Sequence, residues 1–363
     1  MQRVLVSQLQ EGMITARNIY SADGLMLLAA DSEISAQYIR RLEELEIYAI
    51  YVRTPFCEDI EIPTLLDEET RLQSIRTVKR GFDILREKRG PVNLEEIRAY
   101  SWTIVSEHLR TRPAMIHLTG IRTHDDYTFS HSVDVAAISV LVAANLGYTE
   151  KKLQELALGA LLHDIGKVQV APELLNKPDD LTDDEMTTMR GHPLFGFEIL
   201  RKRGNRISMP AVHIALQHHE KYDGTGYPRG LKQDEIHCHA RIVAVADVYD
   251  AITSDRPYRK ALLPHEAYEI MMLSSGYHFD PNILPAFLSR IAVYPVGTVV
   301  SLNTGDVGVV TFVEPGLPTR PLLRLIMDKH RRLYPQGTNL DMRNHLTVFV
   351  DQVVNGRELL NLI

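Results

Sequence analysis

The residues with the clearest chemical potential lie in one short stretch, His163-Asp164-Ile165-Gly166-Lys167, which follows an apolar helical run. The imidazole of His163 offers nitrogen to a borderline metal ion, and the carboxylate of Asp164 has two oxygens and can bridge two ions. Lys167 lies about one helical turn beyond His163 and can reach a phosphate held on such metals. The same stretch is also typical of a helix C-terminus, with Gly166 as the cap and Lys167 complementing the dipole. The stretch alone leaves both interpretations open.

Further imidazoles and carboxylates between residues 131 and 247 favour the metal site. The seven candidate ligands lie near helix ends or on helices bordered by apolar residues: His131, His163, Asp164, His192, His218, His219 and Asp247. A single His on an apolar helix face is usually a satisfied core residue, but this set includes a His-Asp pair and a His-His pair. Five imidazoles and two carboxylates exceed what one ion can hold. They fit two six-coordinate ions that share a carboxylate, and ions ~4 Å apart can clamp a phosphate and lower the pKa of a shared water.

Two downstream segments could bind a substrate. A glycine-rich loop runs from Glu220 to Pro228, and its Gly226 lets the backbone approach a ligand closely. Tyr227 offers a ring for stacking on a base and a hydroxyl for a phosphate. Arg256 and Arg259 place two guanidinium groups three residues apart, and such forks bind phosphate oxygens bidentately. The alternatives are a plain turn for the loop and a solvated pair of charges for the arginines.

Length and composition bound the class of protein. A chain of 363 residues predicts two or three domains, and 45% apolar with 24% charged residues is ordinary for a soluble protein. The net charge of -7 gives no basic surface for a nucleic-acid polymer or an anionic membrane. Cys57 and Cys238 match no metal or redox spacing, and no apolar run reaches the ~20 residues of a membrane span. We therefore expect a cytoplasmic protein without nucleic-acid or membrane contact.

The pattern of apolar residues and turn signals predicts a mainly α protein in four parts. The parts are a small α+β regulatory or interaction module over 1–58, a helical connector over 59–111, a dense helical core over 112–293 and a small β-rich module over 294–363. The first module could bind a signalling protein, and the connector could also be a homodimer surface. Within the core, Ser130 is expected to cap a helix, and Thr182–Glu185 resembles a capping box.

The motifs in this order closely resemble the HD-GYP family, bacterial phosphodiesterases that hydrolyse cyclic di-GMP. The resemblance covers about residues 112–292 and rests on His163-Asp164 with Lys167, on His218 through Pro228, and on the Asp247 helix followed by Arg256-Pro257-Tyr258-Arg259. It implies an all-helical metal-dependent phosphohydrolase core.

The resemblance also implies roles. One ion would take His131, His163 and Asp247 as ligands. The other would take His192, His218 and His219, with Asp164 between the two. Lys167 would contact the scissile phosphate, and the substrate would be held by Gly226, Tyr227, Arg256 and Arg259.

One position departs from the family pattern. Members with three metals carry a Glu four residues before the first ligand His, where this chain has Tyr127. The neighbouring Asp125 and Asp126 are displaced along the helix and point elsewhere. The resemblance therefore implies two divalent ions, iron or manganese with zinc as a further candidate, and linear pGpG as the main product. Rival functions are a phosphodiesterase for cyclic GMP-AMP and a non-catalytic receptor for the cyclic dinucleotide.

Overall fold

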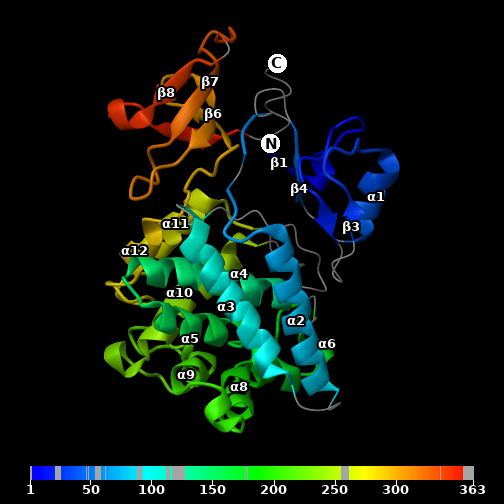
Figure 1. Ribbon diagram of the computed structural model, residues 1–363. Coiled ribbons are helices and arrows are strands. Elements are labelled where there is room, and N and C mark those ends of the chain that lie inside the picture. The colour runs from blue at the N-terminus through cyan, green and yellow to red at the C-terminus, as the bar shows by residue number, and fades with distance from the viewer. Residues whose placement is uncertain are drawn as a thin grey trace. The chain divides into compact units, whose positions relative to one another are not determined.

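The protein is described by a computed structural model (Figure 1) that covers residues 2–20, 26–45, 47, 49–53, 59–61, 63–87, 92–111, 115–116, 127–175, 177, 179–254, 261–335 and 337–354. Its contacts divide the chain into two compact units. The helical unit comprises Leu65–Pro113 and Tyr127–Leu288. The second unit, which contains the strands, comprises Met1–Thr64, Ala114–Asp126 and Ser289–Ile363.

The helical unit makes up the largest part of the structure. Its elements in chain order are α2 (Glu68–Arg86), α3 (Leu94–Thr111), α4 (Tyr127–Asn145), α5 (Glu150–Leu161), the 3-10 helix η3 (Ile165–Gln169), α6 (Pro172–Leu175), α7 (Asp183–Met189), α8 (His192–Arg201), η4 (Gly204–Arg206), α9 (Met209–Gln217), η5 (Gln233–Glu235), α10 (Cys238–Thr253), α11 (Pro264–Leu273) and α12 (Leu284–Leu288). The expected mainly α fold is confirmed. The capping box at the start of α7 is confirmed too. The Thr182 hydroxyl accepts from the backbone N–H of Glu185, and the Glu185 carboxylate accepts from the backbone N–H of Thr182.

Helix α4 forms the centre of this unit and packs against α5 and α10. Most of its residues are apolar, as expected for a helix surrounded by others, and Val133, Ile138 and Val142 are fully buried. The expectation that Ser130 caps this helix is wrong, because α4 begins at Tyr127. The additional turn is stabilised by tertiary packing, since the ring of Phe129 meets that of Phe82 edge to face at 5.5 Å.

Helices α2 and α3, which were expected as a connector, belong to the helical unit. They pack against each other and against α4, and α3 also packs on α5 (Figure 1). A bidentate ion pair joins Arg71 of α2 to Asp134 of α4, with N–O distances of 3.0 and 2.9 Å. The helical unit therefore starts near residue 65, and the four-part division of the chain stays a prediction.

The second unit contains the strands of both chain ends. Its elements are β1 (Gln2–Leu5), η1 (Val6–Gln8), β2 (Ile19–Tyr20), β3 (Met26–Leu28), α1 (Ala36–Glu44), β4 (Ala49–Val52), β5 (Val299–Leu302), β6 (Val307–Phe312), β7 (Leu322–Met327), β8 (Asn339–Asp341), η6 (Met342–Asn344) and β9 (Val350–Val353). Strands β1 and β4 pair, as do β2 and β3, and the other five form an antiparallel sheet in the order β8-β7-β6-β5-β9. Tyr51 and Ile60 belong to the same apolar cluster as Val309 and Leu323 of that sheet, so the two chain ends share a core.

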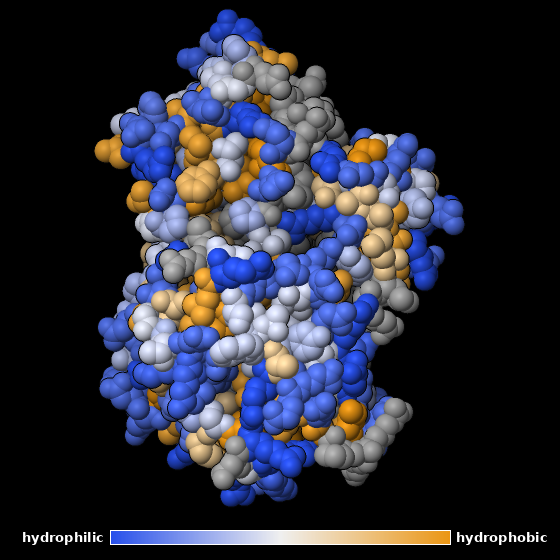
Figure 2. Space-filling view, viewed as in Figure 1, coloured by the Kyte–Doolittle hydropathy of each residue, from blue (hydrophilic) through white to orange (hydrophobic). Residues whose placement is uncertain are grey.

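The surface is mainly hydrophilic on the face shown in Figure 2, with scattered apolar residues. Among the described residues, α4 is the one helix long and apolar enough to cross a membrane, over Thr128–Asn145. Of that segment, 78% is buried inside the structure. Its apolar character is therefore accounted for by its place in the core.

The close contact between α5 and α9 depends on Gly159. A Cβ atom at this position would lie 2.3 Å from Ile214 Cδ1 and 2.9 Å from the backbone Cα of Ala211. We expect Gly159→Ala to lower the free energy of unfolding by about 1–3 kcal/mol, because overpacking outweighs the better helix propensity of Ala. Urea denaturation followed by circular dichroism measures this change.

Gly196→Ala is the matched control. Gly196 lies inside α8, where an added Cβ would have its nearest neighbours at 3.4 Å, an ordinary contact distance. This variant is expected to be neutral or slightly more stable. Equal stability of Gly159→Ala and the wild type would show that the α5–α9 contact has room that the structure does not show.

Candidate metal centre

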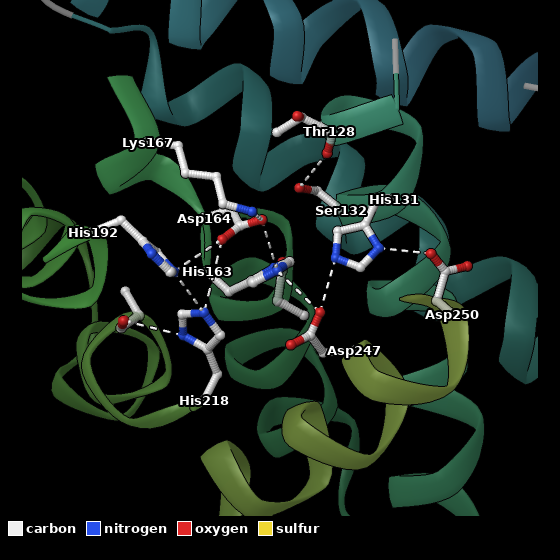
Figure 3. A network of polar contacts seen from close by, with 12 residues as sticks. Thr128, His131, Ser132, His163, Asp164, Lys167, His192, His218, Asp247 and Asp250 are labelled. Atoms are coloured by element: carbon white, nitrogen blue, oxygen red, sulfur yellow. Dashed lines mark hydrogen bonds and ion pairs between the residues drawn. The ribbon is translucent and has the colours of Figure 1, made fainter. Parts of the chain in front are cut away.

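The helical unit brings the seven candidate ligands together from five segments of chain. Figure 3 shows all of them except His219. His131 lies on α4, His163 and Asp164 lie in the turn after α5, and His192 lies at the start of α8. His218 and His219 follow α9, and Asp247 lies on α10. Two groups of close ligand atoms form, and Asp164 belongs to both. One contains Asp164, His192, His218 and His219, and the other contains His131, His163 and Asp164.

The carboxylate of Asp164 faces a different group with each oxygen. Its Oδ1 lies 3.4 Å from Nε2 of His192 and 3.8 Å from Nε2 of His218. Its Oδ2 lies 3.4 Å from Nε2 of His163 and 2.5 Å from Nζ of Lys167. This is the arrangement expected of a carboxylate that bridges two cations.

Backbone carbonyls orient three of the imidazoles. The Nδ1–H groups of His163 and His192 donate to the carbonyl oxygens of Ala160 and Met189, each at 2.7 Å. His218 Nδ1 lies 3.1 Å from the carbonyl oxygen of Ile214. Since these carbonyls accept the Nδ1 proton, we assign the tautomer that leaves a lone pair on each Nε2.

The Nε2 lone pairs then face one another and Asp164 across a buried space. The Nε2 atoms of His192 and His218 are 3.3 Å apart, and neither carries a proton to donate in this tautomer. His163 Nε2 and Asp164 Oδ1 are fully buried and have no hydrogen-bond partner in the structure. Nitrogens that share a first-row ion at ~2.1 Å lie ~3 Å apart, so the donor set fits transition-metal ions. Without a cation, such buried acceptors would be strongly unfavourable.

Two further carboxylates, those of Asp247 and Asp250, orient His131. Its Nδ1 donates to Oδ2 of Asp250 at 2.6 Å, and its Nε2 lies 2.9 Å from Oδ1 of Asp247. Asp247 also reaches the other group, because its Oδ2 lies 3.9 Å from Nδ1 of His219. A carboxylate on the far nitrogen of a ligating His is a common way to hold the ring and strengthen the ligand.

The protonation states suit metal binding at neutral pH. Burial lowers the pKa of His192 to about 4 and that of His219 to about 3, and it also holds the pKa of His218 well below its usual value. Burial alone would raise the pKa of Asp164, but Lys167, followed by His163, holds it well below the ordinary range. Three neutral imidazoles and an ionised carboxylate therefore face the same space.

His131 differs from the other imidazoles. Burial alone would lower the pKa of His131, but hydrogen bonds to Asp247 and Asp250 raise it to about 9. Burial likewise favours a raised pKa for Asp247, but the hydrogen bond from His131 keeps it far below the ordinary range. In the metal-free protein at pH 7, His131 is therefore a cation between two carboxylates.

Gly166 allows the close approach of the turn after α5 to α8. A Cβ atom on Gly166 would lie 1.9 Å from the carbonyl oxygen of His192 and 2.5 Å from the backbone nitrogen of Gly196. Helix α5 ends at Leu161, so the alternative interpretation of Gly166 as the cap of that helix is wrong. Because Gly166 has no side chain, the turn can pack directly on the start of α8, and this contact brings Asp164 close to His192.

The glycine-rich loop lies beside the second group of ligands. The ring of Tyr227 stacks on that of His219, with centroids 4.8 Å apart. A Cβ on Gly226 would meet the backbone of the preceding turn, 2.5 Å from the His219 carbonyl oxygen. Gly226 therefore has a packing function here, and its role in substrate binding stays a prediction. Arg256 and Arg259 lie outside the described residues, as does the side chain of Tyr127.

Two residues near the centre were not predicted from the sequence. Asp250, which orients His131, lies three residues after Asp247 on the same face of α10, and that spacing on an apolar helix was the available signal. Glu220 is buried and accepts backbone hydrogen bonds from Arg229 at 2.8 Å and Leu231 at 3.0 Å. It holds the glycine-rich loop in its folded form.

Parts of this chain are similar in sequence to known proteins. A family model described as "HD domain" matches residues 111–283, and one described as "KOW domain associated with HD domain" matches residues 299–362. A Pseudomonas aeruginosa protein named "Cyclic di-GMP phosphodiesterase PA4108" is 45% identical over 202 residues, which are 56% of this chain and 48% of that protein. A Vibrio cholerae protein named "3'3'-cGAMP-specific phosphodiesterase 3" is 37% identical over 169 residues, 47% of this chain and 36% of that protein.

A solved structure shares the fold. It is titled "Bd1817, a HDG"Y"P protein from Bdellovibrio bacteriovorus", with a TM-score of 0.50 and 20% identity, and the match covers 79% of this chain and 97% of that one. Residues 111–283 therefore resemble HD domains in sequence. The resemblance of this part of the chain to the HD-GYP family is confirmed. The matched part spans about half of the length of the first relative named above.

Metal binding is expected to release about one proton at pH 7. His131, with its pKa raised to about 9, is protonated before binding and must lose a proton to become a ligand. Affinity should therefore rise with pH up to about 9, because protons compete less. Titration calorimetry with Mn²⁺ in two buffers of different ionisation enthalpy counts the protons. Asp250→Asn removes one of the two carboxylates beside His131 and should reduce the number of protons released. A metal affinity that falls between about pH 6 and pH 8 would contradict the assigned protonation of His131.

Gly166→Ala is expected to lower metal affinity by about 10–100-fold, the range found when the groups that support metal ligands are changed. The added methyl would push η3 away from α8 and so separate Asp164 from His192. Equilibrium dialysis with Mn²⁺ measures the affinity. Gly147→Ala is a control in the turn after α4, where a Cβ meets nothing within 4 Å and only the backbone is strained. Unchanged affinity in Gly166→Ala would mean that this contact does not position the ligands.

Proposed function

We propose that this protein is a metal-dependent phosphodiesterase that hydrolyses cyclic di-GMP, with linear pGpG as the main product. The observation that carries the proposal is the buried set of unprotonated nitrogens and carboxylate oxygens around Asp164. The relative at 45% identity, named a cyclic di-GMP phosphodiesterase, supports the choice of substrate. The net charge of -7 favours no polymeric nucleic acid.

Two divalent ions are proposed, iron or manganese before zinc. His131, His163 and Asp247 hold one ion. A separate set holds the other, namely His192, His218 and His219. Asp164 is shared, which agrees with its oxygens facing both groups. When bound, such ions polarise a phosphodiester and lower the pKa of a water molecule.

The protein's own groups complete the reaction. Lys167, whose ammonium lies 2.5 Å from Asp164 Oδ2, is placed to stabilise the negative charge that develops on the scissile phosphate. Neutral His192, His218 and His219 keep their lone pairs for ligation. Tyr227 lies over His219 at the edge of the same site, where it can contact a ribose or base. Gly226, Arg256 and Arg259 are proposed to hold the rest of the substrate.

A second candidate function is hydrolysis of cyclic GMP-AMP, which the name of the 37% identical relative favours. The two substrates differ in one base and share both phosphates, so the described metal centre does not discriminate between them. A non-catalytic receptor would have no need for the full ligand set with Lys167. A cytoplasmic location, a homodimer and a protein partner for the N-terminal module stay predictions.

Asp164→Ala is expected to abolish metal loading and to lower phosphodiesterase activity by more than about 10³-fold, because it removes the carboxylate shared by both groups. Elemental analysis and chromatography of the products from cyclic di-GMP and cyclic GMP-AMP measure both effects. Asp184→Ala changes an exposed acid on α7 and is the control. Full activity of Asp164→Ala, or a metal-loaded wild type inactive on both substrates, would refute the proposed function.

A further inference from the structure

Arg190 lies beside the metal centre on a fixed segment of backbone. It is the residue that caps the C-terminus of α7, and its backbone N–H donates to the carbonyl oxygen of Met186 at 2.9 Å. The carbonyl oxygen of Met189, just before it, accepts the hydrogen bond from Nδ1 of His192. The backbone that carries Arg190 is therefore tied to the ring of a candidate ligand two residues away.

The guanidinium group of Arg190 lies over the ring of Tyr227, beside the candidate metal ligands. Its Cζ lies 5.5 Å from the centroid of the Tyr227 ring, which is the same ring that stacks on His219. A cation held over an aromatic ring loses less freedom on binding a ligand than one that is fully solvated. Arg190, Tyr227 and His219 thus form a continuous stack that ends at a candidate metal ligand.

The charge of Arg190 is not neutralised within the described part of the chain. No carboxylate there lies within ion-pair distance of its guanidinium, although the first turn of α7 carries three acids. Glu185 of that turn pairs with Lys177 instead, at 2.7 Å. Other exposed arginines of this unit are paired, such as Arg201 with Glu198 and Arg80 with Glu96, both at 2.9 Å. Arg190 is exposed, lies over the Tyr227 ring and has no ion-pair partner among the described residues, so it is suited to bind an anion beside the metal centre.

We propose that Arg190 binds the phosphate of the cyclic dinucleotide that is not cleaved, an inference that rests on the proposed function. The substrate carries two phosphates, and the metal centre with Lys167 engages one of them. The second phosphate needs its own countercharge. In addition to the proposed contacts of Arg256 and Arg259, the planar guanidinium of Arg190 can bind two of its oxygens at once. Arg190 is thereby a specificity-determining residue that distinguishes cyclic dinucleotides from diesters with a single phosphate.

Kinetics of Arg190→Ala test the inference. The KM for cyclic di-GMP is expected to rise about tenfold or more, while kcat changes much less, because the lost contact is to a part of the substrate that does not react. The KM for bis(p-nitrophenyl) phosphate, which has one phosphate, should not rise. Arg190→Lys keeps the charge but loses the bidentate fork, so its KM should lie between those of the wild type and Arg190→Ala.

Arg201→Ala is a matched control. Arg201 is also exposed and also lies over an aromatic ring, that of Phe197 at 5.7 Å, but it is at the opposite end of α8 from His192. Its loss should leave the KM for cyclic di-GMP unchanged. An unchanged KM in Arg190→Ala, or an equal loss on both substrates, overturns the inference while leaving the proposed function intact. A metal-loaded wild type that acts on neither cyclic di-GMP nor cyclic GMP-AMP refutes the proposed function itself, and this inference with it.

Discussion

The structure depends on one electrostatic constraint, the convergence of buried lone pairs on the carboxylate of Asp164. Nε2 atoms of His192 and His218 lie 3.3 Å apart, and each also faces Asp164 Oδ1. Acceptors this close repel one another in a medium of low dielectric, and burial removes the water that would relieve them. The helices must hold these groups in place against that repulsion, and a cation between them converts it into binding energy.

The surrounding fold supplies the rigidity that this constraint requires. Backbone carbonyls at the ends of helical turns take the Nδ1 protons, so ring orientation is set by the same residues that form the helices. Gly166 and Gly159 let their segments approach more closely than any side chain would allow. On the other side, Asp250 holds His131 as a cation when no metal is present, and that charge balances Asp247. Without metal, the group around His131 is therefore partly satisfied by its hydrogen bonds to carboxylates, whereas the lone pairs of the group around His192 and His218 have no donor.

Sequence reasoning identified the convergent residues because their chemistry is rare in an apolar core. A His-Asp pair, a His-His pair and an acid on a buried helix have few explanations other than binding the same metal ions. Asp164, His218 and Asp247 could therefore be predicted as metal ligands from the sequence alone. The helical class and the capping box at Thr182 followed from periodicity and local hydrogen bonding, which act over a few residues. The features that the sequence predicted were therefore those set by residues a few positions apart and those made of residue types that are rare in an apolar core.

The remaining features depend on contacts between distant residues. Asp250 meets His131 across 119 positions of sequence, and Arg190 meets Tyr227 only because α7 and the glycine-rich loop fold together. The wrong cap at Ser130 has the same cause, since the extra turn of α4 is stabilised by Phe82 on another helix. Local patterns carry no information about such partners, and the sharing of one core by both chain ends was missed for this reason.

Two cations are proposed to occupy the space around Asp164, one in each group of ligands. Anomalous diffraction from crystals of the protein loaded with Mn²⁺ or Fe²⁺ tests it most directly. Two anomalous peaks are expected, both within bonding distance of the Asp164 carboxylate, one beside His163 and the other beside His192. A single peak, or peaks away from Asp164, would contradict this proposal.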